Sequence, residues 1–218
     1  MRQWRHRQVL KVLGICAFTW VFFIGYFHLL RNPSGPPFEM PLTPLDHWIA
    51  YRPQAIWAYA SLWVFVGVAP ALLPSLRALL LYGAWIAALC ATGLLCFWLW
   101  PTAVPAGFVP ADHGTDPALV LLRGVDASGN ACPSLHVATA VFSAAWLARL
   151  LAAFGAPAWT QLLNALWLAL IVWSTVALRQ HVVLDAAAGT VLGLAFALPS
   201  LRWGPAPLGD GPVTGRRL

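Results

Sequence analysis

The sequence predicts an all-α integral-membrane protein, a bundle of six transmembrane helices with both termini in the cytoplasm. Apolar residues make up 60% of the 218-residue chain and charged residues only 9%, which is far from the composition of a soluble domain. The apolar residues gather in six runs of about 20 residues, the length that crosses a bilayer. The 13 tryptophans also fit a bilayer, because indole rings favour the headgroup region.

The six expected spans are bounded by Pro, Gly and Arg residues, which end or flank apolar helices. They are residues 9–30, 54–73, 78–100, 135–154, 158–178 and 182–201. The basic segment RQWRHRQ before the first run raises the alternative of a signal peptide. That run is too long for a signal peptide and no small-residue cleavage site follows it, so we favour a retained span.

The positive residues between the spans predict the orientation. With the N-terminus inside, nine Lys or Arg residues lie on the inner side and four on the outer side (Arg31, Arg52, Arg123 and Arg179), as the positive-inside rule requires. We expect a six-span domain over residues 1–203 and a disordered cytoplasmic tail over the Pro- and Gly-rich residues 204–218. The preference for Arg over Lys hints at a GC-rich bacterial genome, and thus at an inner membrane.

Several other classes of protein are excluded by the distribution of charge and cysteine. The net charge of +6 forms no basic stripe, so we expect no nucleic-acid partner. Three of the four cysteines lie in apolar runs, so there is neither a disulfide framework nor a metal-ligand pattern, and we expect no metal and no cofactor. The outer segment 101–133 contains an apolar stretch, ALVLLRGV, that fits an interfacial helix.

Two of the six histidines stand at the starts of expected spans, His136 at the fourth and His181 at the sixth. The chain between them crosses the membrane twice, so both imidazoles are expected at the same outer surface. Asp185 follows His181 by one helical turn, and a carboxylate inside a span is costly unless it has a partner. We expect Asp185 to accept a hydrogen bond from one nitrogen of His181 and to make the other nitrogen a base or nucleophile. The alternative is a His–Asp pair that only stabilises the helix.

The segment GNACPSLHVATAVF predicts a helix start that binds an anion. Pro133 ends the preceding loop and Ser134 is a good N-cap. The next backbone N–H groups lie at the positive end of the helix dipole, where phosphate binds. His136, in the first turn, is placed to protonate the leaving oxygen of a phosphate ester.

These motifs resemble those of the type-2 phosphatidic acid phosphatase superfamily, which acts on phosphate esters through a phosphohistidine. PSLH resembles its Pro-Ser-Gly-His motif with Leu135 in place of Gly, and STVALRQHVVLD matches a second motif at Ser174, His181 and Asp185. The resemblance implies that His181 attacks phosphorus, Asp185 orients it, and His136 protonates the departing alkoxide. It also implies that Ser134, with Pro133 beside it, helps to hold the phosphate oxygens.

The chain departs from the family in its positive residues. Leu45 stands where a motif lysine is expected, and Thr175 replaces the arginine of the second motif. Arg52, Arg123 and Arg179 remain as candidate phosphate-binding residues, although Arg179 could equally sit in the headgroup layer. A site with few cations favours a phosphodiester, which carries one negative charge, over a phosphomonoester, which carries nearly two.

PSLH and the His-x-x-x-Asp without its upstream Arg resemble the branch that contains inositol phosphorylceramide and sphingomyelin synthases. The resemblance therefore implies a lipid phosphatase or phospho-headgroup transferase whose substrate is a lipid phosphate or phospholipid and whose site faces the periplasm or exterior. The alternative is a membrane protein that binds or transports lipid and has lost catalysis.

Overall fold

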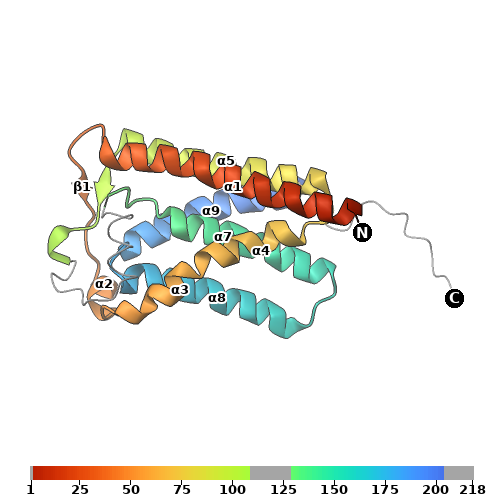
Figure 1. Cartoon of the computed structure of the whole chain (residues 1–218). Coiled ribbons are helices and arrows are strands. Elements are labelled where there is room, and N and C mark those ends of the chain that lie inside the picture. The colour runs from red at the N-terminus through yellow and green to blue at the C-terminus, as the bar shows by residue number, and fades with distance from the viewer. Residues whose placement is uncertain (1, 109–128, 204–218) are drawn as a thin grey trace.

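The computed structural model of the chain describes residues 2–108 and 129–203. Its helices and strands run in the order α1 (Arg2–Arg31), β1 (Phe38–Glu39), α2 (Pro44–Trp48), η1 (Pro53–Ala55), α3 (Ile56–Ala60), α4 (Leu62–Leu72), α5 (Leu76–Leu99), β2 (Thr102–Ala103), η2 (Ala106–Phe108), α7 (Leu135–Ala153), α8 (Ala158–Ala177) and α9 (Val183–Trp203). The long helices lie side by side as an elongated bundle (Figure 1).

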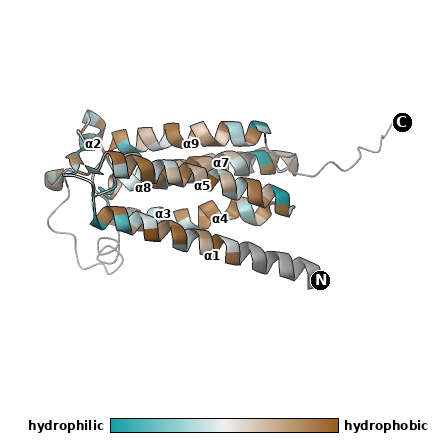
Figure 2. Ribbon diagram, turned by 90° about the horizontal axis from the view of Figure 1, so that it is seen from above, coloured by the Kyte–Doolittle hydropathy of each residue, from teal (hydrophilic) through white to brown (hydrophobic). Residues whose placement is uncertain are grey.

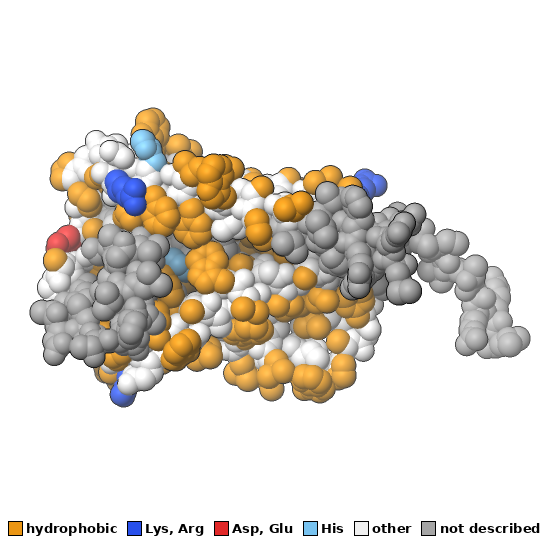
Figure 3. Space-filling view, viewed as in Figure 1, with side chains coloured by type: hydrophobic (Ala, Val, Ile, Leu, Met, Phe, Trp, Pro, Cys, Tyr) orange, Lys and Arg blue, Asp and Glu red, His pale blue; other side chains and the backbone are white. Residues whose placement is uncertain are grey.

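Six helical segments of the described chain are long and apolar enough to cross a membrane, which confirms the expected number of spans. The boundaries differ by a few residues, because α5 begins at Leu76, where Ser75 accepts a hydrogen bond from the N–H of Ala78 at 3.1 Å. Hydrophobic residues colour the helices along their length, and hydrophilic residues lie mainly at the two ends of the bundle (Figure 2). On the face shown in Figure 3, charged side chains lie near the two ends. Both views are those expected of a bilayer protein.

The second span is interrupted, whereas the sequence predicted one continuous run. It starts as a 3₁₀ turn with Pro53 in its first turn, and Ser61 separates α3 from α4. The Ser61 hydroxyl donates to the carbonyl of Ala58 at 2.6 Å, a local bond that competes with the helical ladder. It also accepts from the indole of Trp167 at 2.9 Å, which ties this break to α8.

Helix α7 is the centre of the bundle and packs against α4, α5, α8 and α9. Its closest neighbour is α9, which presents Gly189 and Gly193 to it. A Cβ on Gly189 would collide with the carbonyl oxygen of Ser134, and one on Gly193 would lie 2.7 Å from the carbonyl oxygen of Ala138. Two glycines four residues apart thus let the backbones approach closely, as in membrane helix pairs.

The segments at one end of the bundle are joined by a two-stranded parallel sheet that the sequence did not predict. Phe38 pairs with Thr102 and Glu39 with Ala103. Thr102 also accepts a hydrogen bond from the N–H of Cys132 at 2.8 Å, so the sheet holds the loop that leads into α7. Strands of two residues carry no periodic pattern, which is why sequence analysis missed them.

Helix α1 begins and helix α9 ends at the opposite end of the bundle from this sheet (Figure 1). The expected tail over residues 204–218 and the expected interfacial helix in ALVLLRGV lie outside the described residues, and both stay predictions.

Candidate active site

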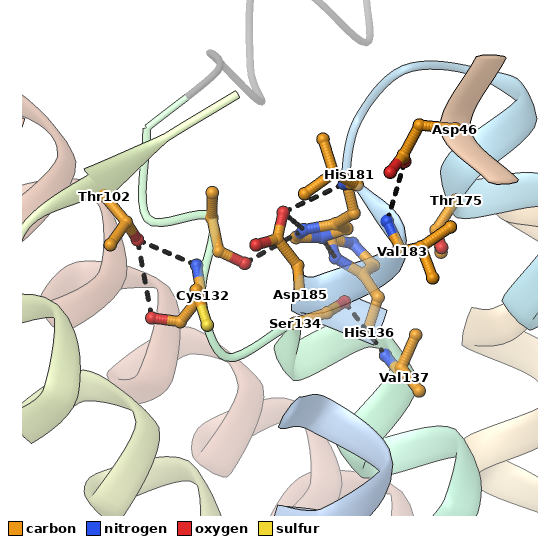
Figure 4. Close-up of polar contacts among 12 residues, drawn as sticks. Asp46, Thr102, Cys132, Ser134, His136, Val137, Thr175, His181, Val183 and Asp185 are labelled. Atoms are coloured by element: carbon orange, nitrogen blue, oxygen red, sulfur yellow. Dashed lines mark hydrogen bonds and ion pairs between the residues drawn. The ribbon is translucent and has the colours of Figure 1, made fainter. Parts of the chain in front are cut away.

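The structure brings together the two histidines that the sequence singled out. His181 Nε2 lies 3.4 Å from His136 Nδ1, and the ring centroids are 5.6 Å apart. Figure 4 shows the two rings side by side, with Asp185 next to His181. His136 comes from the first turn of α7, and His181 from the turn between α8 and α9. The expectation that two membrane crossings return the chain to the same surface is therefore confirmed for this pair.

His181 is held by backbone groups on both sides. The carbonyl of Thr175, near the end of α8, accepts hydrogen bonds from the N–H groups of Gln180 and His181, both at 3.1 Å. Arg179 lies in the chain between Thr175 and these two residues. Its φ is 59°, in the left-handed region that commonly ends helices. The His181 ring is 5% exposed, and its Nδ1 donates to the carbonyl of Ala131 at 3.0 Å. The ring is thus fixed with Nε2 turned toward His136.

Asp185 lies beside His181 but does not take the hydrogen bond that we expected. Its Oδ2 is 3.6 Å from His181 Nδ1 and accepts instead from the N–H of Val182 at 2.9 Å. The reason is that α9 begins at Val183, so His181 precedes the helix and its ring turns to Ala131. Oδ1 is buried and, among the described residues, has no hydrogen-bond partner. Asp185 therefore places a negative charge beside the His181 ring rather than a direct acceptor.

Ser134 is the N-cap of α7, as predicted, and this role occupies it. Its Oγ accepts from the N–H of Val137 at 3.3 Å, and its own N–H donates to the carbonyl of Asp185 at 3.0 Å. The residue is fully buried. The expectation that Ser134 holds phosphate oxygens therefore finds no support in this arrangement, whereas its bond to Asp185 joins the starts of α7 and α9. Pro133 precedes it after a cis peptide bond with Cys132.

Leu135, which stands where the family motif has Gly, lies against α5 and also lines the cavity that reaches the histidines. It is 6% exposed and packs in the core. The space that it fills lies over Gly93 of α5, because a Cβ on Gly93 would collide with the Leu135 side chain. Glycine at position 93 thus makes room for leucine at position 135.

Arg179 is turned away from the histidines, and its guanidinium is used within the fold. It donates to the carbonyls of Asp46 and Ile49, both at 2.8 Å, and lies 3.8 Å from the centre of the Phe108 ring. Burial lowers the pKa of Arg179, and the charge of Asp46 opposes this shift. The side chain therefore fastens α2 to the turn before α9, so the phosphate-binding alternative finds no support, and the headgroup-layer alternative stays a prediction.

Of the other two candidate cations, the structure describes Arg52, and this residue does not line the cavity at the histidines. The Arg52 side chain is exposed, and its backbone N–H donates to the carbonyl of Ala177 at 3.0 Å. Arg123 lies outside the described residues, so its role stays a prediction. The described part of the site is therefore poor in positive charge.

Asp46 is a buried carboxylate that sequence reasoning did not assign to the site. Its Oδ1 accepts from the N–H of Val183 at 2.8 Å, and its Oδ2 accepts from both the N–H and the hydroxyl of Thr43 at 2.7 Å. The sequence did contain a signal for this residue, because Thr43-x-x-Asp46 has the spacing of a capping box at a helix start. With Asp185 on Val182, two carboxylates occupy the first N–H groups at the start of α9.

Tyr59 of α3 is the second residue that sequence analysis missed. Its hydroxyl lies 2.7 Å from His136 Nε2, and the two ring centroids are 4.7 Å apart. The side chain is 3% exposed. In the sequence, Tyr59 is one aromatic residue in an apolar run, and nothing distinguishes it before the fold brings α3 to α7.

A cavity of about 1510 Å³ extends from the histidines into the bundle. Tyr59, His136 and His181 line one end, and residues 73–75, the turn between α4 and α5, line the other. Between them the walls are largely apolar side chains of α1, α4 and α5, and the described lining residues include no Lys or Arg. The cavity exceeds the usual range of small-molecule pockets, about 300–1,000 Å³.

Cys132 lies directly before Pro133 and Ser134 in the chain, and its surroundings make it a poor nucleophile. Burial raises the pKa of Cys132 to about 11, and the charge of Asp185 adds to the shift. At neutral pH the sulfur is therefore a protonated thiol, whereas attack needs the thiolate. The chemistry of the site is left to the histidines.

A family model described as the PAP2 superfamily, the type-2 phosphatidic acid phosphatases that the motifs resemble, matches residues 38–198. The match covers about three quarters of the chain and includes Asp46, Tyr59, His136, His181 and Asp185. No curated protein and no solved structure matches the chain.

Proposed function

Since this chain belongs to the PAP2 superfamily, which generally comprises phosphatases and phosphotransferases of phosphate esters, we propose that it cleaves a lipid phosphate ester through a phosphohistidine. The observation that carries the proposal is the pairing of His181 Nε2 with His136 Nδ1 at 3.4 Å, at the end of an apolar cavity. One ring supplies a nucleophile and the other a proton donor.

The nucleophile is His181 Nε2. A carbonyl oxygen can only accept, so the bond to Ala131 fixes a proton on His181 Nδ1 and leaves the lone pair on Nε2. When Nε2 attacks phosphorus, an N–P bond forms and the P–O bond to the leaving alcohol breaks. The carboxylate of Asp185, 3.6 Å from Nδ1, stabilises the positive charge that the ring acquires.

The proton for the leaving oxygen comes from His136 Nδ1, the ring nitrogen that faces the nucleophile. In the second step, water or another alcohol attacks phosphorus, gives its proton back to His136 and breaks the N–P bond. Water as acceptor makes the protein a phosphatase or diesterase, and an alcohol makes it a headgroup transferase.

The substrate is a lipid because the cavity continues from the histidines along apolar walls to the α4–α5 turn. A single hydrocarbon chain that enters between α1 and α4 would lie against these walls, with its phosphate at the histidines. The starts of α7 and α9 meet there, since Ser134 N–H bonds to the carbonyl of Asp185. Helix N-termini favour an anion.

A phosphodiester suits this site better than a phosphomonoester. Arg179 is occupied by carbonyls of Asp46 and Ile49, and the described cavity residues include no cation. A monoester brings nearly two negative charges close to the carboxylate of Asp185, whereas a diester brings one. This preference, together with PSLH and the His-x-x-x-Asp without arginine, supports the branch of inositol phosphorylceramide and sphingomyelin synthases.

The site is proposed to face the periplasm of a bacterial inner membrane. The start of α1 and the end of α9 lie at the bundle end opposite the histidines, and the positive-inside bias favours that end as the cytoplasmic one. A cysteine accessibility assay in intact cells, with an introduced cysteine at Glu39, tests this orientation.

The function is tested with purified, detergent-solubilised protein and labelled lipids, phosphatidic acid as the monoester and phosphatidylinositol as the diester. We expect His181→Ala to lower turnover by on the order of 10³-fold or more, while His28→Ala, at an exposed histidine, keeps the wild-type rate. Unchanged turnover in His181→Ala would refute the phosphohistidine mechanism. Tight lipid binding without a phosphorylated enzyme after rapid quench would identify a lipid-binding protein instead.

The products identify the reaction class. Free phosphate from phosphatidic acid would show that monoesters are hydrolysed and would contradict the diester preference. Labelled headgroup phosphate on a second alcohol would show transfer, and a water-soluble headgroup phosphate would show diester hydrolysis.

A further inference from the structure

Tyr59 completes a row of hydrogen-bonding groups through the two histidines. Its hydroxyl lies 2.7 Å from His136 Nε2 and 3.5 Å from His136 Nδ1, and His136 Nδ1 lies 3.4 Å from His181 Nε2. The row ends at the carbonyl of Ala131, 3.0 Å from His181 Nδ1. Tyr59 is held in place by its position in a small core with Ile56 of its own helix and Ala177 and Leu178 at the end of α8.

The carbonyl at the end of this row fixes the tautomer of His181, and the shorter of the two Tyr59 contacts, the one at Nε2, orients the bonds of His136. Ala131 only accepts, so His181 carries its proton on Nδ1 and accepts at Nε2. His136 then donates from Nδ1 and accepts at Nε2, and the Tyr59 hydroxyl donates to that nitrogen. A phenol is a donor at neutral pH, since free tyrosine ionises only near pH 10. Tyr59 therefore selects the His136 tautomer that presents a proton to the nucleophile.

A neutral imidazole that lost its single N–H proton would become an imidazolate, which is a strong base. Neutral His136 is consequently a weak acid unless its other nitrogen gains a proton at the same time. The group hydrogen-bonded to that nitrogen is Tyr59. Tyr59 from α3 and His181 from the turn before α9 are titratable groups that face His136, and the Trp63 ring of α4 packs edge-on with the His136 ring.

We propose that Tyr59 is the positioning residue of His136 and the source of the proton that replaces the one given to the leaving alcohol. The inference rests on the proposed function. As the P–O bond breaks, the proton on His136 Nδ1 passes to the alkoxide oxygen, and the Tyr59 proton passes to Nε2, which leaves a phenolate and a neutral imidazole. When water or an alcohol attacks the phosphohistidine, its proton enters at Nδ1 and the Nε2 proton returns to Tyr59.

The test is Tyr59→Phe, which removes the hydroxyl and keeps the ring. We expect kcat for an alkyl lipid ester to fall on the order of 10²-fold, the usual contribution of a positioned acid. Without this transfer of a proton from Tyr59 to His136, here called the relay, His136 acts as an acid only when both of its ring nitrogens are protonated. The alkaline limb of the kcat–pH profile therefore moves to lower pH by at least about one unit. A uniform loss at every pH would overturn the proposal.

A second readout uses a long-chain alkyl 4-nitrophenyl phosphate, whose nitrophenolate departs without a proton. Tyr59→Phe is expected to release nitrophenolate in the first turnover at near the wild-type rate. An equal loss with both leaving groups would mean that the hydroxyl only supports the fold or the binding of substrate.

The matched control is Tyr51→Phe, because the Tyr51 hydroxyl is buried and, among the described residues, has no partner. It is expected to keep the wild-type rate and pH profile. The variant His181→Ala separates a failure of the proposed function from a failure of the Tyr59 proposal, because the proposed function requires that it abolish nitrophenolate release. If wild type and His181→Ala behave alike, the function is wrong, whereas if only the Tyr59→Phe results fail, the function stands and the relay is wrong.

Discussion

The carboxylate of Asp46 accepts a hydrogen bond from the backbone N–H of Val183 at 2.8 Å, which joins the loop after α1 to the first turn of the helix behind His181. We expect Asp46→Ala to lower the free energy of unfolding by about 3 kcal/mol, since it leaves buried N–H groups unpaired. Glu39→Ala, at an exposed carboxylate in the same loop, is the control and should have little effect. Thermal unfolding in detergent measures both, and equal melting temperatures would show that the contact does not stabilise the fold.

Leu135 and Gly93 are predicted to depend on each other. Leu135→Ala leaves a cavity over α5 and should cost about 2–5 kcal/mol, and Gly93→Ala forces a methyl group against the Leu135 side chain. The double variant places the new methyl group in the space that leucine vacates. We therefore expect its loss of stability to be smaller than the sum of the two single losses, by about 1 kcal/mol or more.

This pair is measured as a double-mutant cycle of unfolding free energies. Gly83→Ala, in the same helix with open space around its Cα, controls for helix propensity and should not lower stability. Additive losses in the cycle would mean that the two residues do not share one space.

Arg179 is predicted to affect stability and not phosphate affinity. Its guanidinium bonds two carbonyls and lies over the Phe108 ring, a geometry that lysine does not reproduce. Arg179→Lys should therefore lower the melting temperature, while the inhibition constant of orthophosphate changes less than about threefold. A large rise in that constant with an unchanged melting temperature would place Arg179 at the phosphate after all.

The sequence was sufficient for the spans and for the two histidines, because bilayer length and the motif positions are local properties of the chain. It was insufficient for the partners of those histidines. Asp185 lost the expected hydrogen bond because α9 starts two residues after His181, and the position of a helix start depends on caps such as Asp46. Tyr59 was invisible for a different reason, since only tertiary packing distinguishes it from the other aromatic residues of its run.

The same limit explains the arginines. Their positions between the spans could be predicted from the sequence, but a guanidinium group reaches far enough to bind in several directions. Only the positions of the carbonyls of Asp46 and Ile49 show that Arg179 is turned away from the histidines.

The glycines of α9 have a consequence for how such a protein can diverge. Gly189 and Gly193 bring α9 against backbone atoms of Ser134 and Ala138. Main-chain contacts therefore set the spacing between α7, which carries His136, and α9, which follows His181 and carries Asp185. Under the proposed function, substitutions among the apolar cavity residues of α1, α4 and α5 would then alter which hydrocarbon tail is accepted without moving the histidines. Tail selectivity and phosphorus chemistry can therefore be inherited separately, and a new specificity needs no rebuilding of the reaction centre.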